Sequence, residues 1–426
     1  MAQIRIKVLG GGREVGRAAV AIGSNGNYLL LDYGINFNDK DIPQLPLHIR
    51  PNELVAITVS HAHLDHIGAL PMLYTSAKIP AVMTRVTKEL SKIMLSDFLK
   101  ISGYYLPYEQ IDIEMMLDNT IDLYYDEEVN FGDYVVKLVN AGHIPGSAMT
   151  LIEVNGTRIL YTGDVNTINT RLVKGAFLNG IKADILITEG TYGNSIHPSR
   201  EEIEKEFIES VREVIDEGGN VLIPAFSLGR SQEILLLLYE KLRWAAVYYD
   251  GMIRVINDVL VSHPEYLNRY DLLVRALKEF RMVRKSSERR KIIKGEGNII
   301  VSSAGMLKGG PAVYYLKKIM DDPNSAVFLV SYQGPTTPGR SLLENGYLTE
   351  GGEQVKARVQ WFDFSSHAGA DGLIKLVKSV RGLSKVVLIH SEEETGLVFK
   401  EKLQEILSGV DIYFPVNGEE LLIDLN

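Results

Sequence analysis

Strands and helices alternate strictly through the middle of the chain, from residue 199 to residue 355. Ser199-Arg200-Glu201-Glu202 has the pattern of a capping box, and the helix that it opens should stop at Gly218-Gly219. Such alternation predicts a parallel sheet covered by helices on both faces. The segments that carry this prediction are apolar stretches typical of strands at 221–225, 245–249, 298–302 and 326–330, and helical patterns at 231–241 and 312–320.

The first third of the chain has a different texture, with short strands joined by tight turns. Asn25-Gly26 and Asn155-Gly156 are favoured hairpin turns, and apolar segments typical of strands flank both of them. A helical pattern covers 88–101, where apolar residues recur at three- and four-residue steps, and an apolar helix is expected from Ile67. We therefore expect layered α+β structure, with sheets packed together and helices outside.

These two textures divide the chain into domains. Residues 199–355 form one predicted domain, flanked by 1–198 and 356–426. The last segment is short for a domain with its own core, so we expect it to complete the first one. The middle domain is then an insertion, and the fold class is α/β (α+β).

The composition limits the chemistry that the chain can carry. No cysteine occurs among its 426 residues, so a bound metal ion must be held by His, Asp or Glu. Hydrophobic residues make up 46% and charged residues 23%, which is typical of a soluble globular protein. The longest apolar stretch falls far below the ~20 residues of a membrane span, and the first residues do not resemble a signal peptide. We expect a cytoplasmic protein with no membrane partner.

The charge of the chain is unevenly distributed. A net charge of −9 argues against a protein that coats nucleic acid, but not against a locally basic groove. The stretch 269–294 carries ten Lys and Arg against three Asp and Glu. This pattern indicates either a solvated helix surface or a phosphate-contacting face of the insertion.

Three of the nine histidines lie within six residues, His61-Ala62-His63-Leu64-Asp65-His66, between an apolar strand and an apolar helix. Side chains two positions apart on an extended segment point the same way, so His61 and His63 can share one metal ion. As the chain turns into the helix, Asp65 and His66 are re-aimed and can serve a second ion. A histidine-rich surface loop without metal would not be expected between two apolar segments.

With this motif the sequence resembles the metallo-β-lactamase superfamily, whose signature is His-x-His-x-Asp-His. Glu189, His367 and His390 lie in segments that resemble motifs A, B and C of its β-CASP branch, a group of nucleases with an inserted cap domain. The resemblance implies a metallo-β-lactamase αββα sandwich with an inserted doubly wound parallel-sheet β-CASP domain. Besides the histidine motif, the residues that carry the resemblance are, in chain order, Asp32, His143, Asp164, Glu189, His367 and His390.

Within this branch the sequence looks most like the endonuclease subunit of the eukaryotic cleavage and polyadenylation specificity factor and its archaeal relatives. Residues 60–71, 225–233 and 303–311 carry this closer resemblance. Gly190 departs from motif A, where Ser is commoner. The chain starts directly with the lactamase-like strands, as in members without amino-terminal KH domains.

Carried over residue by residue, the resemblance implies a ligand set for two zinc ions. Imidazole and carboxylate ligands suit zinc, and they also suit manganese. Asp32 is expected to orient a ligand, or else to cap the turn before Tyr33-Gly34. The implied ligands are His61, His63 and His143 for one ion, Asp65, His66 and His390 for the other, and Asp164 as a bridge between them.

The same resemblance implies a mechanism. Two ions ~3.5–4 Å apart lower the pKa of a shared water towards ~7, so that hydroxide attacks the scissile phosphorus. A general acid must protonate the leaving 3′-oxygen, and His367 is the candidate, with Glu189 holding its imidazole. Asp65 is counted with these two among the catalytic residues. The ribose 2′-hydroxyl is not the attacking group, so a 5′-phosphate and a 3′-hydroxyl are expected.

The leading hypothesis is a zinc-dependent ribonuclease that cuts single-stranded RNA internally, in RNA 3′-end processing or decay. A 5′→3′ exoribonuclease like ribonuclease J is the alternative, which the sequence does not separate from the first. A small-molecule metallo-hydrolase has no use for Glu189, His367 and an inserted domain. A non-catalytic scaffold would have lost metal ligands. Besides RNA, a homodimer and subunits of a processing complex are the partners considered.

A few residues of the insertion are candidate substrate contacts. Arg230 and Arg340 lie in Gly-, Ser- and Pro-rich loops, and guanidinium groups match phosphates in a bidentate manner. Ser302 and Ser303 follow a predicted strand and offer hydroxyl and backbone contacts to phosphate, or form a plain turn. For His197 an interdomain or substrate role is considered.

Overall fold

The computed structural model describes residues 3–348 and 352–424. Contacts divide the chain into two compact units. The expected domain boundaries, after residues 198 and 355, stay predictions. Of the predicted domains, residues 1–2, 349–351 and 425–426 lie outside the described residues. The first unit comprises Met1–Asn169, Gly175–Ile196 and His367–Asn426, and the second comprises Thr170–Lys174 and His197–Ser366.

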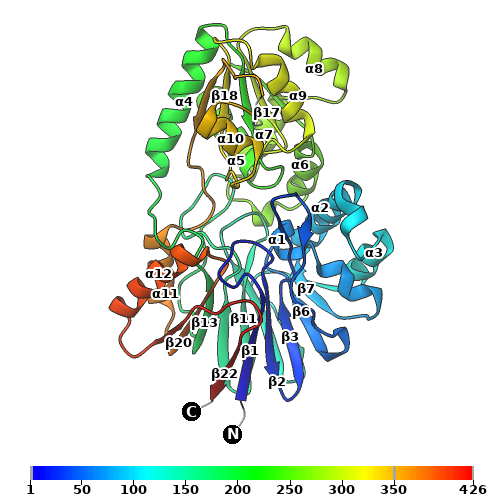
Figure 1. The fold of residues 1–426 in the computed structure, drawn as a ribbon, viewed down its shortest axis with the longest axis vertical. Coiled ribbons are helices and arrows are strands. Elements are labelled where there is room, and N and C mark those ends of the chain that lie inside the picture. The colour runs from blue at the N-terminus through cyan, green and yellow to red at the C-terminus, as the bar shows by residue number, and fades with distance from the viewer. Residues whose placement is uncertain (1–2, 349–351, 425–426) are drawn as a thin grey trace. The chain divides into compact units, whose positions relative to one another are not determined.

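The first unit is built on two seven-stranded sheets (Figure 1). Strand β22 pairs antiparallel with β1, so a late segment of the chain completes a sheet that an early segment begins. In order across the first sheet, the strands are β22 (Glu420–Asp424), β1 (Gln3–Gly10), β2 (Ala19–Ser24), β3 (Asn27–Leu31), β6 (Leu54–Thr58), β7 (Ala81–Thr84) and β8 (Thr120–Leu123). In the second sheet they are β21 (Asp411–Tyr413), β20 (Lys385–Ile389), β13 (Ile185–Glu189), β12 (Thr157–Tyr161), β11 (Ala148–Val154), β10 (Tyr134–Asn140) and β9 (Glu128–Phe131).

Apolar side chains from both sheets meet in one core. Ile6 and Leu29 of the first sheet and Val136 and Ile152 of the second are fully buried members of it. Because each such side chain stabilises the fold by roughly 1.5–3 kcal/mol when removed from water, this layer holds the two sheets face to face.

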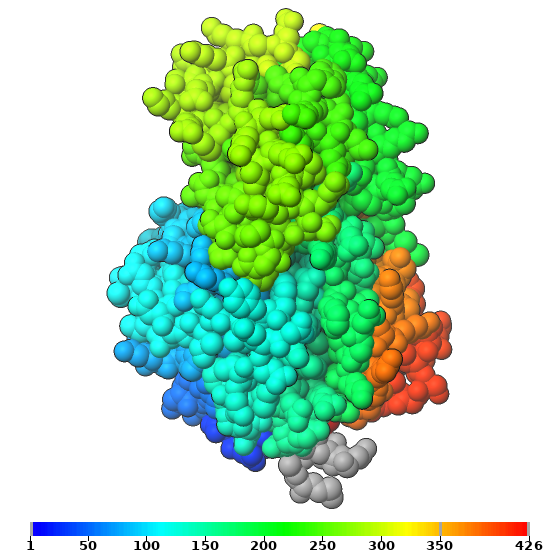
Figure 2. Space-filling view, turned by 180° about the vertical axis from the view of Figure 1, so that it is seen from behind, coloured from blue at the N-terminus to red at the C-terminus, as the bar shows by residue number. Residues whose placement is uncertain are grey.

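Helices cover the outer faces of both sheets. On the first sheet, α2 (Arg85–Ser102) packs against β7 and β8, and α3 (Gln110–Asp118) packs against α2. Figure 2 shows the segment that carries both helices, in light blue to cyan, at the surface. On the second sheet, α11 (Ala370–Ser379) and α12 (Glu393–Ile406) bury Leu376 and Phe399 against the outer face. The layers are helix, sheet, sheet and helix, which confirms the predicted αββα sandwich.

Most strands of this unit follow the sequence pattern, and one helix does not. Both Asn-Gly turns have positive φ at the two central residues, with 52° and 87° at Asn25 and Gly26, as a type I′ hairpin requires. The helix expected from Ile67 is wrong. Helix α1 (Leu64–Ile67) ends there, and a 3₁₀ helix follows at Leu70–Thr75 because Pro71 has no N–H to continue an α-helix. The two-stranded sheet of β4 (Asn36–Phe37) and β5 (Pro43–Gln44) was not predicted.

The second unit contains a six-stranded parallel sheet, as its alternating sequence predicts. Alternate residues of its strands enter two separate cores, so helices cover both faces in a doubly wound arrangement. Ser199 caps the start of α4, because its hydroxyl accepts a 3.3 Å hydrogen bond from the Glu202 N–H, and this hydroxyl also donates to the Glu202 carboxylate at 2.7 Å. In order across the sheet, the strands are β16 (Arg281–Met282), β15 (Ala246–Asp250), β17 (Asn298–Ser302), β14 (Val221–Pro224), β18 (Ala326–Leu329) and β19 (Arg358–Trp361).

Two groups of helices flank this sheet. Helices α4 (Arg200–Asp216), α5 (Arg230–Lys241), α6 (Ile253–Val261) and α7 (Tyr270–Glu279) contribute to one core. Helices α8 (Ser286–Ile293), α9 (Gly310–Ile319) and α10 (Pro338–Asn345) contribute to the other. Further 3₁₀ turns lie at Pro51–Glu53, Gly103–Tyr105 and Pro264–Tyr266. Among the described residues, no helix is long and apolar enough to cross a membrane.

Candidate metal centre

The predicted site residues of the first unit follow the ends of neighbouring strands. Strands β12, β13 and β20 are adjacent and parallel, so their carboxyl ends lie at one edge of the second sheet. Asp164, Glu189 and His390 lie at or just beyond these three ends. The edge therefore gathers polar side chains that are far apart in the sequence.

The histidine motif enters the same cluster from the first sheet. Strand β6 ends at Thr58, and the chain bends at Ala62 and His63 into the first turn of α1, with φ −75° and ψ 148° at His63. His61 and His63 lie together, with Nε2 of the first 3.1 Å from Nδ1 of the second. His66 lies on α1 and is buried.

One group of ligand atoms comes from His61, His63, His143 and Asp164, all within 4.8 Å of one another. Nε2 of His61 and Nε2 of His143 each lie 3.5 Å from Oδ2 of Asp164. His143 is held in the β10–β11 loop, where its backbone N–H donates to the Ser147 hydroxyl at 3.0 Å.

A second group comes from Asp65, His66, Asp164 and His390, again within 4.8 Å. Nε2 of His66 lies 3.2 Å from Oδ1 of Asp164, and Nε2 of His390 lies 3.4 Å from Oδ2 of Asp65. Asp164 thus presents one carboxylate oxygen to each group. His390 has a left-handed backbone with φ 49°, and its N–H donates to the Gly11 carbonyl at 2.6 Å, which holds the imidazole at the end of β20.

The donor atoms of these groups fit a bound cation. Nε2 of His63, His66 and His390 and Oδ1 of Asp164 are buried and find no hydrogen-bond partner of normal geometry among the described residues. Three of these atoms, those of His66, His390 and Asp164, belong to one ligand group, whereas His63 faces His61 and His143 with its Nδ1. Buried polar atoms normally have partners, so the three need a further ligand. Nitrogen and oxygen donors without thiolate are those that zinc and manganese accept. The cluster is a metal-ion site.

Burial and neighbouring charges together set the protonation of the cluster. Burial lowers the pKa of His61 well below its usual value, and the neighbouring His66 adds to this effect, so His61 is held neutral. Burial alone would raise the pKa of Asp164, but the imidazoles of His66 and His390 hold it well below its usual value. Burial lowers the pKa of His66 and of His390, but the Asp164 carboxylate outweighs it and raises both. These two imidazoles must therefore release a proton when they bind a metal ion, since neutral imidazole is the form that binds metal.

Asp32 lies directly behind this centre. Its side chain is fully buried, and Oδ2 lies 2.7 Å from Nδ1 of His66. The same oxygen accepts hydrogen bonds from the Ser60 hydroxyl at 2.6 Å and from the Tyr161 hydroxyl at 2.7 Å. These contacts orient His66 so that its Nε2 faces Asp164. Ser60 and Tyr161 were missed in the sequence, although they directly flank the histidine motif and the Asp164 turn.

Glu189 and His367 form a pair beside the same cluster. Nδ1 of His367 lies 3.1 Å and 3.0 Å from the two carboxylate oxygens of Glu189, and its Nε2 lies 3.7 Å from Oδ2 of Asp164. Oε1 of Glu189 also accepts a 2.7 Å hydrogen bond from the Val165 N–H. Burial lowers the pKa of His367, but the carboxylates of Glu189 and Asp164 outweigh it and raise this pKa to about 9.

The four predicted substrate contacts all lie in the second unit. Ser302 is buried at the end of β17, and the Ser303 hydroxyl accepts from the Met252 N–H at 3.3 Å. Arg340 is paired with Glu344 on α10 at 2.6 Å, and one guanidinium nitrogen of Arg230 lies 3.4 Å from the Ser366 hydroxyl. The structure thus gives each of them a partner within the protein.

His197 lies in the second unit as well. Its Nδ1 is 2.7 Å from Oδ2 of Asp363, although 166 residues separate the two in the sequence. Asp363 also accepts from the Ser365 N–H at 3.0 Å, and Arg200 donates to the Ser365 carbonyl at 2.8 Å. These bonds join residues near 197–200 to residues near 363–365. Neither segment carries a local sequence signal that predicts the contact.

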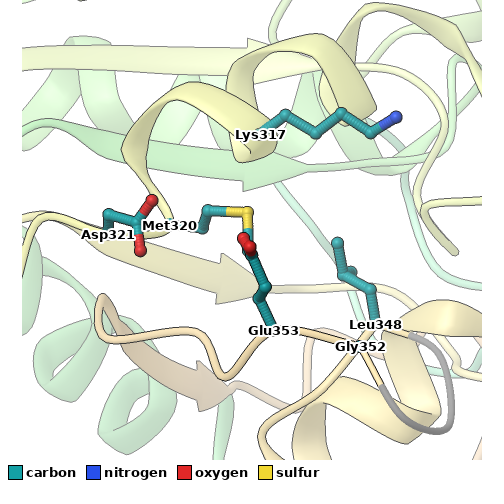
Figure 3. Close-up of a pocket in the computed structure, with 6 residues that line it drawn as sticks. All are labelled: Lys317, Met320, Asp321, Leu348, Gly352 and Glu353. Carbon is teal, nitrogen blue, oxygen red and sulfur yellow. The ribbon is translucent and has the colours of Figure 1, made fainter.

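A surface pocket of about 320 Å³ also lies in the second unit, after the end of α9 (Figure 3). None of the predicted site residues lines it. In Figure 3 the Lys317 side chain extends along one side of the pocket, and Glu353 points toward Met320. The residues that line this pocket are Lys317, Met320, Asp321, Leu348, Gly352 and Glu353.

Two packed sheets with a His and Asp cluster at the carboxyl edge of their strands define a metallo-hydrolase of the metallo-β-lactamase fold. The chain belongs to the β-CASP branch of the metallo-β-lactamase superfamily. Residues 22–190 match the metallo-beta-lactamase superfamily domain, 231–342 match the Beta-Casp domain, and 352–415 match the Zn-dependent metallo-hydrolase RNA specificity domain.

Relatives match over most of the chain. RNase aCSPSF2 of Saccharolobus solfataricus is 46% identical over 418 residues, which is 98% of this chain and 85% of the relative. Probable RNase MJ4 of Methanocaldococcus jannaschii is 38% identical, over 97% of this chain and 99% of the relative. Transcription termination factor FttA of Pyrococcus abyssi is 37% identical, over 92% of this chain and 67% of the relative.

A solved structure shows the same fold. A protein of unknown function from Enterococcus faecalis V583 has a TM-score of 0.62 at 14% identity, and the match covers 99% of this chain and 100% of that one.

Proposed function

We propose that this protein is a metal-dependent ribonuclease that hydrolyses phosphodiester bonds of single-stranded RNA, in RNA 3′-end processing or decay. Relatives named as RNases and the match to an RNA specificity domain support this activity. The observation that carries the proposal is the pair of Glu189 and His367 beside Asp164, whose ligand atoms lie within 4.8 Å of one another. A proton donor next to a metal site is what cleavage of a phosphodiester bond requires.

The metal is proposed to be a pair of zinc ions. His61, His63 and His143 would hold one ion, Asp65, His66 and His390 the other, and Asp164 would contribute one oxygen to each. When bound, the ions would supply positive charge to the phosphate and activate a water molecule. Manganese satisfies the same ligand types.

The protein's own residues have three tasks in this proposal. Asp32 fixes the orientation of His66 through Nδ1, and Tyr161 and Ser60 fix Asp32 in turn. Glu189 accepts a hydrogen bond from the Nδ1–H of His367 and stabilises the imidazolium. His367 then carries a proton at Nε2, the nitrogen on the Asp164 side, and donates it to the leaving 3′-oxygen.

A small-molecule metallo-hydrolase is less well supported, because it would not need the Glu189–His367 pair. An RNA-cutting enzyme and a small-ester hydrolase make different predictions for His367→Ala. This variant should lose RNA cleavage through loss of the leaving-group proton. The proposal would be overturned if the wild type and His367→Ala both hydrolysed small esters and neither cleaved RNA.

The mode of cleavage is proposed to be endonucleolytic. Single-stranded RNA, end-labelled in its linear form and internally labelled in its circular form, would be incubated with and without chelator. Cutting of the circle, with loss of cleavage on chelation, is the expected result. Decay of the linear strand beside an intact circle would establish exonuclease action instead. His48→Ala, a change at an exposed histidine of the same unit, is the matched control for His367→Ala.

Location and assembly are also proposals. We propose a cytoplasmic enzyme that forms a homodimer and associates with further processing subunits. Light scattering of the purified chain tests the homodimer, since a monomeric mass at micromolar concentration would contradict it.

A further inference from the structure

We propose that α8 and the preceding strand β16 form a second RNA-contacting surface, which binds the phosphate backbone of the substrate independently of the metal centre. The inference rests on the proposed function, because it takes single-stranded RNA as the ligand. The surface, called the α8 basic face below, consists of Arg281, Arg284, Lys285, Arg290, Lys291 and Lys294.

The charge of this segment is unbalanced. Seven basic residues lie between Arg281 and Lys294, and Glu288 is the one acidic residue among them. Both carboxylate oxygens of Glu288 accept backbone N–H groups, of Arg284 at 3.3 Å and of Lys285 at 3.2 Å. This carboxylate therefore stabilises the start of the helix and neutralises no side chain.

The structure also separates basic residues with a structural task from those without one. Arg289 is half-buried and forms two hydrogen bonds to the fully buried Asp250, at 2.6 Å and 3.1 Å. The six residues of the α8 basic face are exposed, and none of them forms an ion pair with a described residue. Their charges are thus available to a ligand.

Helical geometry brings the exposed charges together. Residues three and four positions apart lie on the same side of a helix, so Arg290, Lys291 and Lys294 share one side of α8. The opposite side carries Ile292, which is buried in the core beneath the helix, and Arg289. Figures 1 and 2 show the yellow-green segment that contains α8 at the surface of the second unit.

An aromatic platform adjoins these charges. Arg281 of β16 is paired in register with Tyr248 of β15, and its guanidinium lies 5.7 Å from the centre of the tyrosine ring. Strand β16 is at the edge of the sheet. Arginine planes and tyrosine rings are the groups on which unpaired bases stack, so this pair favours a single strand over an acidic protein segment.

The net negative charge of the chain makes a local basic surface useful for binding RNA. A chain with net charge −9 repels a polyanion over most of its surface, and a local basic face offsets this repulsion. Phosphate contacts of this kind give affinity without sequence preference. The α8 basic face would therefore retain long substrates and leave the choice of scissile bond to the metal centre.

The test compares charge reversals in the full chain, with His367→Ala in every variant so that RNA survives the measurement. The probe is a fluorescein-labelled single-stranded RNA of mixed sequence, about 30 nucleotides long, titrated between 50 and 200 mM salt. R290E/K291E/K294E is expected to weaken binding at least tenfold, and to reduce the slope of log Kd against log salt by about 2, since each contact to a single strand contributes ~0.7.

The matched control reverses three exposed charges on and after α11, K375E/K378E/R381E. It should change the Kd less than twofold. Equal losses of affinity in both triple variants, or no loss in the α8 variant, would overturn the inference. So would a competition experiment in which poly-glutamate displaces the labelled RNA at lower concentrations than unlabelled RNA of the size of tRNA does. Should the reversal unfold the protein, R290Q/K291Q/K294Q provides the same comparison with a smaller perturbation, checked by circular dichroism.

Failure of the α8 basic face and failure of the proposed ribonuclease function give different experimental results. A metal-loaded wild type that fails to cut any RNA refutes the ribonuclease. A wild type that cuts RNA, beside an α8 variant that binds RNA as tightly as its control, refutes the α8 basic face alone.

Discussion

Both carboxylate oxygens of Glu189 lie within 3.1 Å of the same nitrogen of His367. That nitrogen, Nδ1, is therefore fixed as a donor, and the proton that can leave is the one on Nε2. Because Glu189 is itself held by the Val165 N–H, the imidazole is positioned by a group that cannot rotate away.

The first prediction concerns this pair. Glu189→Gln should lower the rate of RNA cleavage by about 10²-fold, since the amide does not stabilise an imidazolium. The Glu189 carboxylate raises the pKa of His367, so its removal should move the alkaline limb of the pH–rate profile to lower pH. Single-turnover cleavage from pH 6 to 10 measures both effects. Glu153→Gln, the same change at an exposed strand position, serves as the control, and an unmoved alkaline limb would rule out His367 as the acid.

The second prediction concerns metal content. Asp164 presents one oxygen to each ligand group, so Asp164→Ala should reduce bound metal to well below the wild-type amount and abolish cleavage. Elemental analysis of the purified proteins gives the metal-to-chain ratio. Asp258→Ala, on the exposed side of α6, should keep the wild-type ratio. Full cleavage by an ion-free Asp164→Ala protein would contradict the assigned role of the site.

The third prediction concerns stability. Ligands that bind only the folded state stabilise it by about 2.7 kcal/mol at a hundredfold excess over Kd. Removal of metal leaves buried nitrogen atoms of His66 and His390 without partners, so chelation should lower the melting temperature. Zinc, and manganese to some extent, should restore it. A melting temperature that is indifferent to chelator would show that the cluster folds without a cation.

The fourth prediction concerns the attacking group. A single deoxyribose at the scissile position should leave cleavage within a few fold of the all-RNA substrate, because the 2′-hydroxyl takes no part in the bond-forming step. Products should carry a 5′-phosphate and a 3′-hydroxyl, which end-group analysis identifies. A 2′,3′-cyclic phosphate product would mean that the ribose hydroxyl attacks.

The fifth prediction concerns acid stability. Burial raises the pKa of Asp363, but the hydrogen bond from His197 outweighs it and the net shift is downward. A carboxyl group with a lowered folded-state pKa stabilises the protein above its unfolded pKa of about 3.9, and this contribution is lost as pH falls through the folded value. Asp363→Asn should therefore reduce the free energy of unfolding by roughly 1.5–3 kcal/mol near neutral pH, with the difference shrinking below pH 4.

Urea unfolding of both proteins between pH 3 and pH 7 measures this difference. Asp371→Asn, at an exposed carboxylate on α11, is the control. A loss that stays constant down to pH 3 would assign the effect to packing and exclude the ion pair.

The structural features predicted correctly are those with a local pattern of apolar and turn residues in the sequence. Strand β17 has the predicted bounds, 298–302, because an apolar run between turn residues leaves few alternatives. The converging site residues were found through motifs that recur in a family. Contacts with no local signal were missed. The bond from Tyr161 to Asp32 and the pair of His197 and Asp363 each join segments more than a hundred residues apart.

In the basic stretch 269–294, too, the sequence could not identify a long-range partner. Composition grouped Arg289 with its neighbours, but the structure turns it inward to neutralise Asp250. Helix periodicity could assign Ile292 to the core, yet only the packed sheet identifies the buried carboxylate that an arginine must meet.

The antiparallel pairing of β22 with β1 and the position of His390 after β20 have a consequence for biosynthesis. A ribosome delivers the inserted unit in full before it delivers β20, β21 and β22. The nascent first unit must wait, with its hydrophobic layer incomplete and one ligand missing, while its neighbour folds. The complete ligand set can therefore form only after β20 has been synthesised.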